Sequence, residues 1–168
     1  ERLAMNVGAK LRGLYAITDP KLTPPLTMVQ QVEAALAGGA RIIQLRDKSS
    51  DRALRLRLAQ QLRDLTARHD ALLIINDDAE LCRAVQADGV HLGQDDLPLE
   101  EARKIAESFG RNSSFLIGRS THSLEQALEA QEEGADYIGC GPVFSTPTKP
   151  DYAARGLDLV RQYRNRIR

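Results

Sequence analysis

The chain has 168 residues, the size of a single domain that can bury a hydrophobic core without disulfides or metal ions to hold it. Its 23 basic and 23 acidic side chains cancel, so no overall field would draw it to nucleic acid or to an anionic membrane. No apolar segment approaches the roughly 20 residues that cross a bilayer, and the beginning of the chain does not resemble a signal peptide. We therefore expect a soluble, cytoplasmic protein that binds small molecules, with neither nucleic acid nor membrane as a partner.

Six short apolar segments are each too brief for a helix of normal length, and they predict buried strands. In chain order they are residues 14–17, 42–45, 72–75, 90–92, 115–117 and 137–140. Between them apolar residues recur at helical spacing, and the last helix is expected near Gly156 to Arg166. This alternation predicts six βα units and an α/β fold with a parallel sheet.

Polar residues that cap helices, and glycines that end them, support these boundaries. The helix starts are expected at Asp51, Asp78, Asp95 and Ser123, with Ser123 and Gln126 as a capping box. The helix ends are expected at Gly39, Gly89 and Gly134, where glycine can adopt the left-handed conformation.

The number of βα units does not decide whether the sheet closes into a barrel. An eight-stranded parallel barrel usually needs about 250 residues and seldom fewer than about 200. Six units fall two short, so either the sheet is open or the end of a barrel is absent. Residues 1–12 are expected to form a lead-in of uncertain structure, and the chain begins with Glu1, which suggests a piece of a longer protein.

Polar residues follow successive predicted strands, and the carboxyl ends of parallel strands all lie at one edge of the sheet. Asp77 and Asp96 end the third and fourth strands, so their carboxylates could share a hard divalent cation. Magnesium is the natural candidate, because it takes oxygen ligands and uses only one or two protein carboxylates besides water and phosphate. The alternative is that both are helix caps or turn residues, which aspartate also favours.

Cationic and hydroxyl side chains predict an anion site at the same edge. Arg46 and Lys48 follow the second strand with a period of two, so both side chains point to one side of an extended segment. After the sixth strand, Lys149 lies with Thr146 and Thr148 in a loop whose conformations are restricted by prolines. The alternative for a single lysine is a solvated surface charge.

Gln44, Tyr15 and Ser120 lie in or just after strands and could hydrogen-bond a polar heterocycle, although a buried Gln or Tyr is usually a satisfied core group. His91 and His122 have no second ligand at zinc spacing. We expect His91 to be structural. His122 is either an acid or base or, more commonly, an ordinary residue at a helix entry.

Six motifs in order resemble the thiamine phosphate synthase family over about residues 13–165. They are residues 15–19, 44–48, 75–78, 89–96, 118–122 and 141–149. The resemblance implies a TIM (βα)8 barrel, of which residues 13–168 would form a partial domain lacking the last two βα units. It implies a transferase that joins 4-amino-2-methylpyrimidine-5-methyl diphosphate to 4-methyl-5-(2-phosphoethyl)thiazole. The products would be thiamine phosphate and pyrophosphate.

The resemblance also implies a role for each matching residue. The pyrophosphate would be held by Arg46, Lys48, Asn76, Thr146, Thr148 and Lys149, and four of these, Arg46, Lys48, Asn76 and Lys149, would be catalytic. Asp77 and Asp96 would hold Mg²⁺. Gln44 and Ser120 would contact the pyrimidine, with Tyr15 close by.

The chain departs from the family pattern at one place. The glycine-rich loop for the thiazole phosphate, and a later serine at a strand end, have no counterpart before Arg168. Two alternatives stay open: a related thiazole tautomerase, which does not need the pyrophosphate residues, and a non-catalytic protein that binds a phosphate ligand. The oligomeric state, including a homo-oligomer, is open as well.

Overall fold

The computed structural model describes residues 11–22, 25–48, 50–110, 114–146 and 153–168. One parallel sheet contains six strands in chain order. They are β1 (Tyr15–Ile17), β2 (Ile42–Leu45), β3 (Leu72–Asn76), β4 (Gly89–Leu92), β5 (Leu116–Thr121) and β6 (Tyr137–Cys140). The six predicted strands are therefore confirmed, with β5 extending to Thr121.

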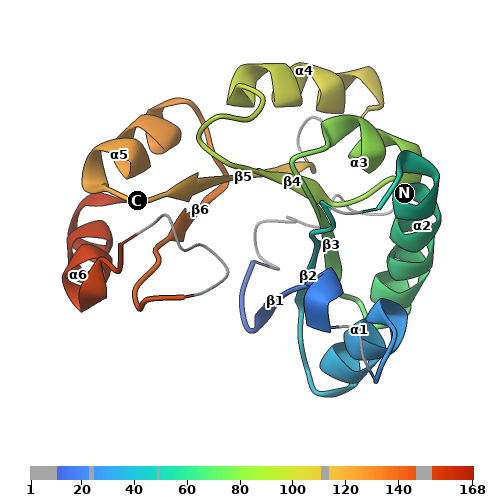
Figure 1. Ribbon diagram of the computed structural model, residues 1–168. Helices are drawn as coiled ribbons and strands as arrows, with labels where there is room; N and C mark the ends of the chain where they lie inside the picture. The colour runs from blue at the N-terminus through green and yellow to red at the C-terminus, as the bar shows by residue number, and fades with distance from the viewer. Residues whose placement is uncertain (1–10, 23–24, 49, 111–113, 147–152) are drawn as a thin grey trace.

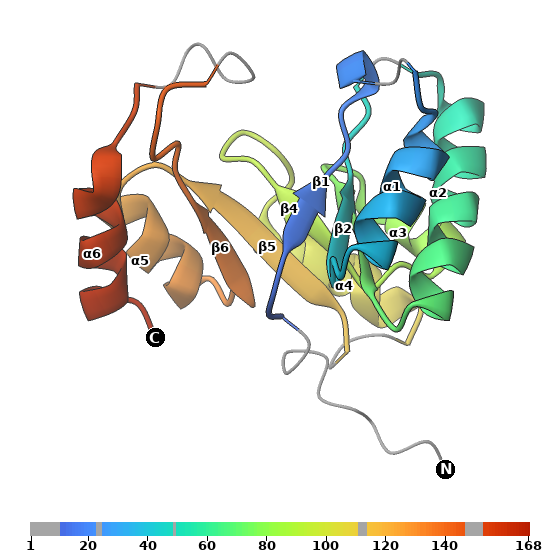
Figure 2. The same ribbon diagram turned by 90° about the horizontal axis from the view of Figure 1, so that it is seen from below.

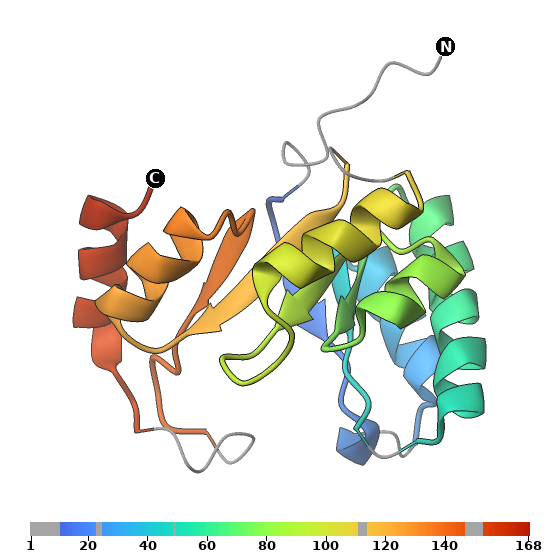
Figure 3. The same cartoon turned by 90° about the horizontal axis from the view of Figure 1, so that it is seen from above.

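A helix follows every strand. The helices are α1 (Met28–Ala37), α2 (Arg52–Arg68), α3 (Ala79–Val85), α4 (Leu99–Ser108), α5 (Leu124–Glu132) and α6 (Gly156–Arg166), and a short 3-10 helix, η2 (Pro20–Leu22), precedes α1. The sheet curves into an arc with the helices along its outer side (Figure 1). Helices α5 and α6 lie at one end of the arc and α1 and α2 at the other, as Figures 2 and 3 show.

Successive side chains of each strand point to opposite faces of the sheet, because side chains alternate along an extended backbone. Ile43, Leu73 and Ile117 point outward into the large core beneath the helices. Ile42 and Ile74 belong to a smaller inner cluster that also holds Leu72 and Leu116. Because helices cover one face and the arc encloses the other, the strands read as continuous apolar segments rather than alternating ones. In the part of the chain that the structure describes, no helix combines the length and the apolar character that a membrane span requires.

The expected closed TIM (βα)8 barrel is wrong for this structure. Among the described residues, β1 pairs only with β2 and β6 only with β5, so the sheet is a six-stranded half-barrel with two open edges. The physical reason is that an arc of six strands spans only part of the circle that eight strands close. The arc nevertheless curls enough for side chains of the edge strands to meet inside it, since the Tyr15 and Tyr137 hydroxyls lie 2.9 Å apart.

Three of the four predicted helix starts are confirmed. The side chains of Asp51, Asp78 and Ser123 each accept a hydrogen bond from the backbone N–H three residues later. The Gln126 side chain accepts from the backbone of His122, so the reciprocal bond of a capping box is not made at Ser123. The expectation for Asp95 is wrong, because α4 begins after Pro98 and has no side-chain cap.

The glycine predictions are right at two helix ends and wrong at the third. Gly39 and Gly134 have φ angles of 96° and 87°, in the region that favours glycine. After α3, however, Gln86 takes the left-handed conformation, and Gly89 lies inside β4. A Cβ at Gly89 would come within 2.3 Å of the Leu116 carbonyl oxygen, so close approach of two strands, rather than a turn, requires this glycine.

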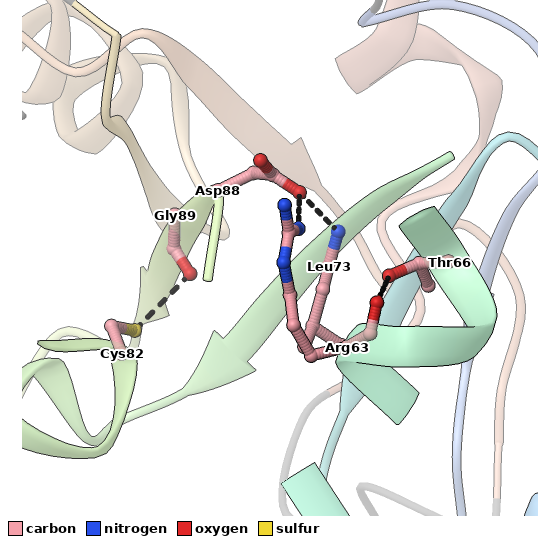
Figure 4. A network of polar contacts seen from close by, with 6 residues as sticks. All are labelled: Arg63, Thr66, Leu73, Cys82, Asp88 and Gly89. Carbon is pink, nitrogen blue, oxygen red and sulfur yellow. Dashed lines mark hydrogen bonds and ion pairs between the residues drawn. The ribbon is translucent and has the colours of Figure 1, made fainter. Parts of the chain in front are cut away.

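Two similar ion pairs hold the amino ends of the strands. Asp88, directly before β4, accepts hydrogen bonds from Arg63 of α2 at 2.6 Å and from the backbone N–H of Leu73 in β3 at 2.9 Å (Figure 4). Two units later, Asp136 accepts at 2.8 Å from Arg103 of α4 and at 2.8 Å from the backbone N–H of Ile117 in β5.

We call these the amino-end clamps. Each ties a helix and two neighbouring strands through one carboxylate. They fix the amino edge of the sheet and leave the opposite edge to the loops that carry the site.

Candidate functional site

Six of the predicted site residues line two hollows at the carboxyl ends of the strands. The first, which we call the inner cavity, has a volume of about 380 Å³ and lies on the inner side of the arc. Tyr15, Gln44 and Ser120 line it. The second, the outer hollow, measures about 490 Å³, and Lys48, Asn76, Asp77 and Asp78 line it together with residues of α2, α3 and α4. The structure thus separates the heterocycle candidates from the charged ones.

Hydrogen bonds connect the polar side chains of the inner cavity to one another. Gln44 is almost fully buried and donates through Nε2 to the Tyr15 hydroxyl at 2.8 Å. His91 lies between two hydroxyls, with Nδ1 3.2 Å from that of Tyr137 and Nε2 2.9 Å from that of Ser120. These contacts satisfy polar groups in a mostly apolar cavity and hold their positions.

Both cavity tyrosines are neutral phenols near neutral pH. Burial raises the pKa of Tyr15, and hydrogen bonds to Tyr137 and Gln44 offset only part of this effect. Burial also raises the pKa of Tyr137, well above its ordinary value, and the neighbouring Tyr15 adds to the increase. Each hydroxyl therefore keeps its proton and can donate one hydrogen bond.

Asp77 and Asp96 come together at the ends of β3 and β4. Burial raises the pKa of the Asp77 carboxyl, the neighbouring Asp96 carboxylate raises it further, and Lys48 acts in the opposite direction. The Lys48 ammonium lies 3.0 Å from Asp77 Oδ2. The backbone of Asp77 has φ 63°, an uncommon angle for a residue other than glycine, and its N–H donates to the His91 carbonyl at 2.9 Å.

This pair of carboxylates offers oxygen ligands of the kind that a magnesium ion takes. No group of three or more His, Cys, Asp or Glu side chains is placed to hold a metal among the described residues. Mg²⁺ does not need such a group, because it keeps several waters and takes phosphate oxygens beside one or two carboxylates. Burial is the main reason that the pKa of Asp77 is raised, and the Asp96 carboxylate raises it further; a divalent cation between the two carboxylates would favour their charged forms.

The loop that carries Asp96 is held from two sides. The Gly93 N–H donates to Asp96 Oδ2 at 2.7 Å, and buried Arg119 of β5 donates to the Gly93 carbonyl at 2.6 Å. Gln94 donates to the Ser120 carbonyl at 2.6 Å. Arg119 of β5 thus holds the loop that carries Asp96, and Gln94 of that loop ties it to the Ser120 backbone of the same strand.

The structure describes only some of the other residues that were predicted to bind the anion. Lys48 is exposed, whereas Arg46 is half-buried, and its side chain forms no ion pair with a described residue. The backbone of Arg46 is tied to Thr18 by two hydrogen bonds. Thr146 lies in the described part of the loop after β6, whereas Thr148 and Lys149 lie outside the described residues.

The two histidines differ from each other in their surroundings. Nδ1 of His122 lies 2.5 Å from the Gly141 carbonyl oxygen, which orients the ring toward the loop after β6. His91, which we expected to be structural, lines the inner cavity together with His122 and Tyr137.

The site residues predicted from the sequence did not include Tyr137, Arg119 and Gln94. Tyr137 carried a signal that we did not use, since strand register places His91 opposite Gly118, and Gly118 opposite Tyr137. Two rings therefore flank one glycine on the inner face of the sheet. Aligning the predicted strands by their parity would have assigned Tyr137 to the same face as Ser120 and Gln44.

Comparisons with known proteins give a consistent result. A family model described as thiamine monophosphate synthase matches residues 14–168. A thiamine-phosphate synthase of Methanospirillum hungatei is 47% identical over 156 residues, covering 92% of this chain and 73% of that protein. One from Halalkalibacterium halodurans is 51% identical over 138 residues, covering 82% and 63%. One from a Synechococcus strain is 51% identical over 150 residues, covering 89% and 41%.

A solved structure agrees. The thiamine phosphate pyrophosphorylase from Pyrococcus furiosus is 40% identical and superimposes with a TM-score of 0.84, covering 97% of this chain and 74% of that one. The chain thus spans between 41% and 73% of the length of the three relatives named above.

Proposed function

Because the chain belongs to the thiamine monophosphate synthase family, we propose that it forms the pyrimidine and pyrophosphate side of a thiamine-phosphate synthase. The reaction joins 4-amino-2-methylpyrimidine-5-methyl diphosphate to 4-methyl-5-(2-phosphoethyl)thiazole and releases pyrophosphate. The observation that carries the proposal is the 3.0 Å contact of Lys48 with Asp77, beside Asp96. A magnesium–diphosphate complex takes one or two carboxylates as metal ligands, and a nearby cation offsets the remaining charge of the phosphates.

Asp77 and Asp96 would hold Mg²⁺, which supplies positive charge against the negative charge that grows on the departing pyrophosphate. Lys48, Arg46 and Asn76 supply further cationic and amide donors from the ends of β2 and β3. Thr146, Thr148 and Lys149 would complete the donor set from the loop after β6. With the donors held in place before the reaction, little reorganisation is needed when the C–O bond breaks.

The inner cavity suits the pyrimidine. Its mostly apolar lining excludes water from a carbon that becomes electron-poor as pyrophosphate leaves, and Gln44 and Ser120 offer hydrogen-bond partners to ring nitrogens or to the amino group. Tyr15 fixes Gln44 through their 2.8 Å hydrogen bond. Positioning and dryness are the main requirements for a step in which the thiazole nitrogen attacks this carbon.

The test is pyrophosphate release by the purified protein, measured with each substrate and with Mg²⁺ left out in turn. Release that requires all three supports the synthase. Lys48→Ala should reduce the rate, whereas Arg57→Ala, a change of an exposed arginine on α2, should not. Tight binding of thiamine phosphate without turnover would instead identify a binding protein, and isomerisation of a thiazole carboxylate phosphate would identify the tautomerase. The cytoplasmic location and a homo-oligomeric state stay predictions.

A further inference from the structure

One continuous chain of hydrogen-bonding side chains crosses the interior of the arc. It runs from Gln44 of β2 through Tyr15 of β1, Tyr137 of β6 and His91 of β4 to Ser120 of β5. Its four contacts measure 2.8, 2.9, 3.2 and 2.9 Å in that order. We call it the interior hydrogen-bond chain. Five of the six strands contribute to it, including both edge strands that do not pair with each other.

The four contacts permit a direction of hydrogen bonding that runs from Gln44 to Ser120. Gln44 donates to the Tyr15 oxygen; either tyrosine hydroxyl can donate to the other, and in this direction Tyr15 donates to Tyr137. The Tyr137 proton then points to Nδ1 of His91. A neutral imidazole that accepts at Nδ1 carries its proton on Nε2, which donates to the Ser120 oxygen.

The last member of the chain faces the ligand space. Ser120 lines the inner cavity. In this direction the Ser120 oxygen accepts from His91, and its own proton is available to a ligand. We propose that Tyr137 is a positioning residue that acts through His91 to make Ser120 a hydrogen-bond donor toward an acceptor nitrogen of a heteroaromatic ligand. Naming that ligand as the aminopyrimidine rests on the proposed function, whereas the direction of the chain does not.

The backbone is built to admit the two rings at the centre of this chain. A Cβ on Gly118 would lie 2.2 Å from Cζ of Tyr137 and 2.6 Å from Nδ1 of His91. Both rings therefore occupy the space that any other residue at position 118 would fill. The rings of His91 and Tyr137 also lie against each other, with centroids 5.5 Å apart. This packing leaves Tyr137 little freedom to turn away from His91.

The first experiment reads the proton on His91 directly. Nitrogen-15 NMR of histidine-labelled protein resolves three histidines, and replacing His91 with Gln assigns its signals. We expect a neutral ring with the proton on Nε2 in the unaltered protein, and a mixture of tautomers in Tyr137→Phe. Tyr163→Phe is the matched control, because it removes a phenol that contacts Thr121 and Ser123 outside the chain. A ring protonated on Nδ1 in the unaltered protein would overturn the proposal.

The second experiment measures binding of 4-amino-5-hydroxymethyl-2-methylpyrimidine by calorimetry. Loss of one oriented hydrogen bond should weaken binding about tenfold in Tyr137→Phe and leave it unchanged in Tyr163→Phe. Equal weakening in both variants would mean a general effect of lost phenols and would contradict the positioning role. If the unaltered protein does not bind this pyrimidine, the proposed function fails, while the NMR result still decides the direction of the chain.

Discussion

At the amino ends of the strands, Asp88 and Asp136 each accept hydrogen bonds from an arginine and from a backbone N–H. At the carboxyl ends, Asp77 instead meets a lysine and a second carboxylate, and its backbone adopts φ 63°. The two edges of one sheet thus use aspartate in opposite ways. A carboxylate that is paired with fixed donors stabilises the fold. A carboxylate beside a like charge is available to bind a ligand, and it destabilises the fold while no ligand is bound.

Asp77→Asn is the strongest test of this difference between the two edges of the sheet. Asparagine tolerates the left-handed backbone, so the variant should fold with its unfolding free energy changed by no more than about 0.5 kcal/mol. Activity should fall about 1,000-fold, equivalent to about 4 kcal/mol of transition-state stabilisation, because the metal loses a charged ligand. Pyrophosphate release and urea unfolding measure the two quantities. The control is Asp64→Asn, which changes an exposed residue of α2. If the Asp77→Asn protein loses stability but keeps its rate, Asp77 stabilises the fold and does not act in the reaction.

The complementary change at the other edge is Asp88→Ala. It leaves Arg63 and the Leu73 N–H without their carboxylate, so we expect a loss of about 3 kcal/mol in unfolding free energy. The rate of the folded fraction should stay within about twofold, since the clamp lies at the far edge of the sheet. Asp88→Asn, which keeps an acceptor but no charge, should lose less. Equal rate losses in Asp77→Asn and Asp88→Ala would show that the two edges are not independent.

The two amino-end clamps are expected to differ in strength. The Asp136 and Arg103 side chains are 34% and 26% exposed, against 12% and 27% for Asp88 and Arg63. Solvent screens the more exposed carboxylate, so Asp136→Ala should cost only about 1 to 2 kcal/mol. Urea unfolding of the two alanine variants side by side tests the order. A larger loss at Asp136 would mean that burial does not rank these clamps.

The smallest expected effect is a pH dependence that belongs to Asp77. Its folded pKa is raised above the ordinary carboxyl value of 3.8, chiefly by burial. The folded state therefore binds this proton more tightly than the unfolded state does, and the contribution of Asp77 to stability falls as pH rises from that value through the raised one. Subtracting the stability–pH curve of Asp77→Asn from that of the unaltered protein isolates this contribution, and a difference that grows more favourable with rising pH would contradict the sign.

Much of the fold was available from the sequence. Apolar periodicity is a local property, so the six strands, the last helix and the caps at Asp51, Asp78 and Ser123 could all be predicted. Because parallel strands share one carboxyl edge, the sequence also predicted that the polar residues after the strands would gather there. The pairing of Asp77 with Asp96 depends only on neighbouring strands, and the structure places these carboxylates side by side.

The remaining features depended on contacts between segments far apart in the chain. The curvature that accumulates over the whole sheet decides whether six strands close into a barrel. The same curvature brings the side chains of Tyr15 and Tyr137 into contact across the inside of the arc. Gly89 looked like a helix end, although its reason lies in the Leu116 backbone of another strand. The partners of His91 likewise could not be predicted, because strand register brings Gly118 and Tyr137 beside it. The local spacing of apolar residues determines which strand or helix a residue belongs to. Only the packed sheet decides which other residues that residue contacts, because these contacts depend on the twist and curvature of all six strands.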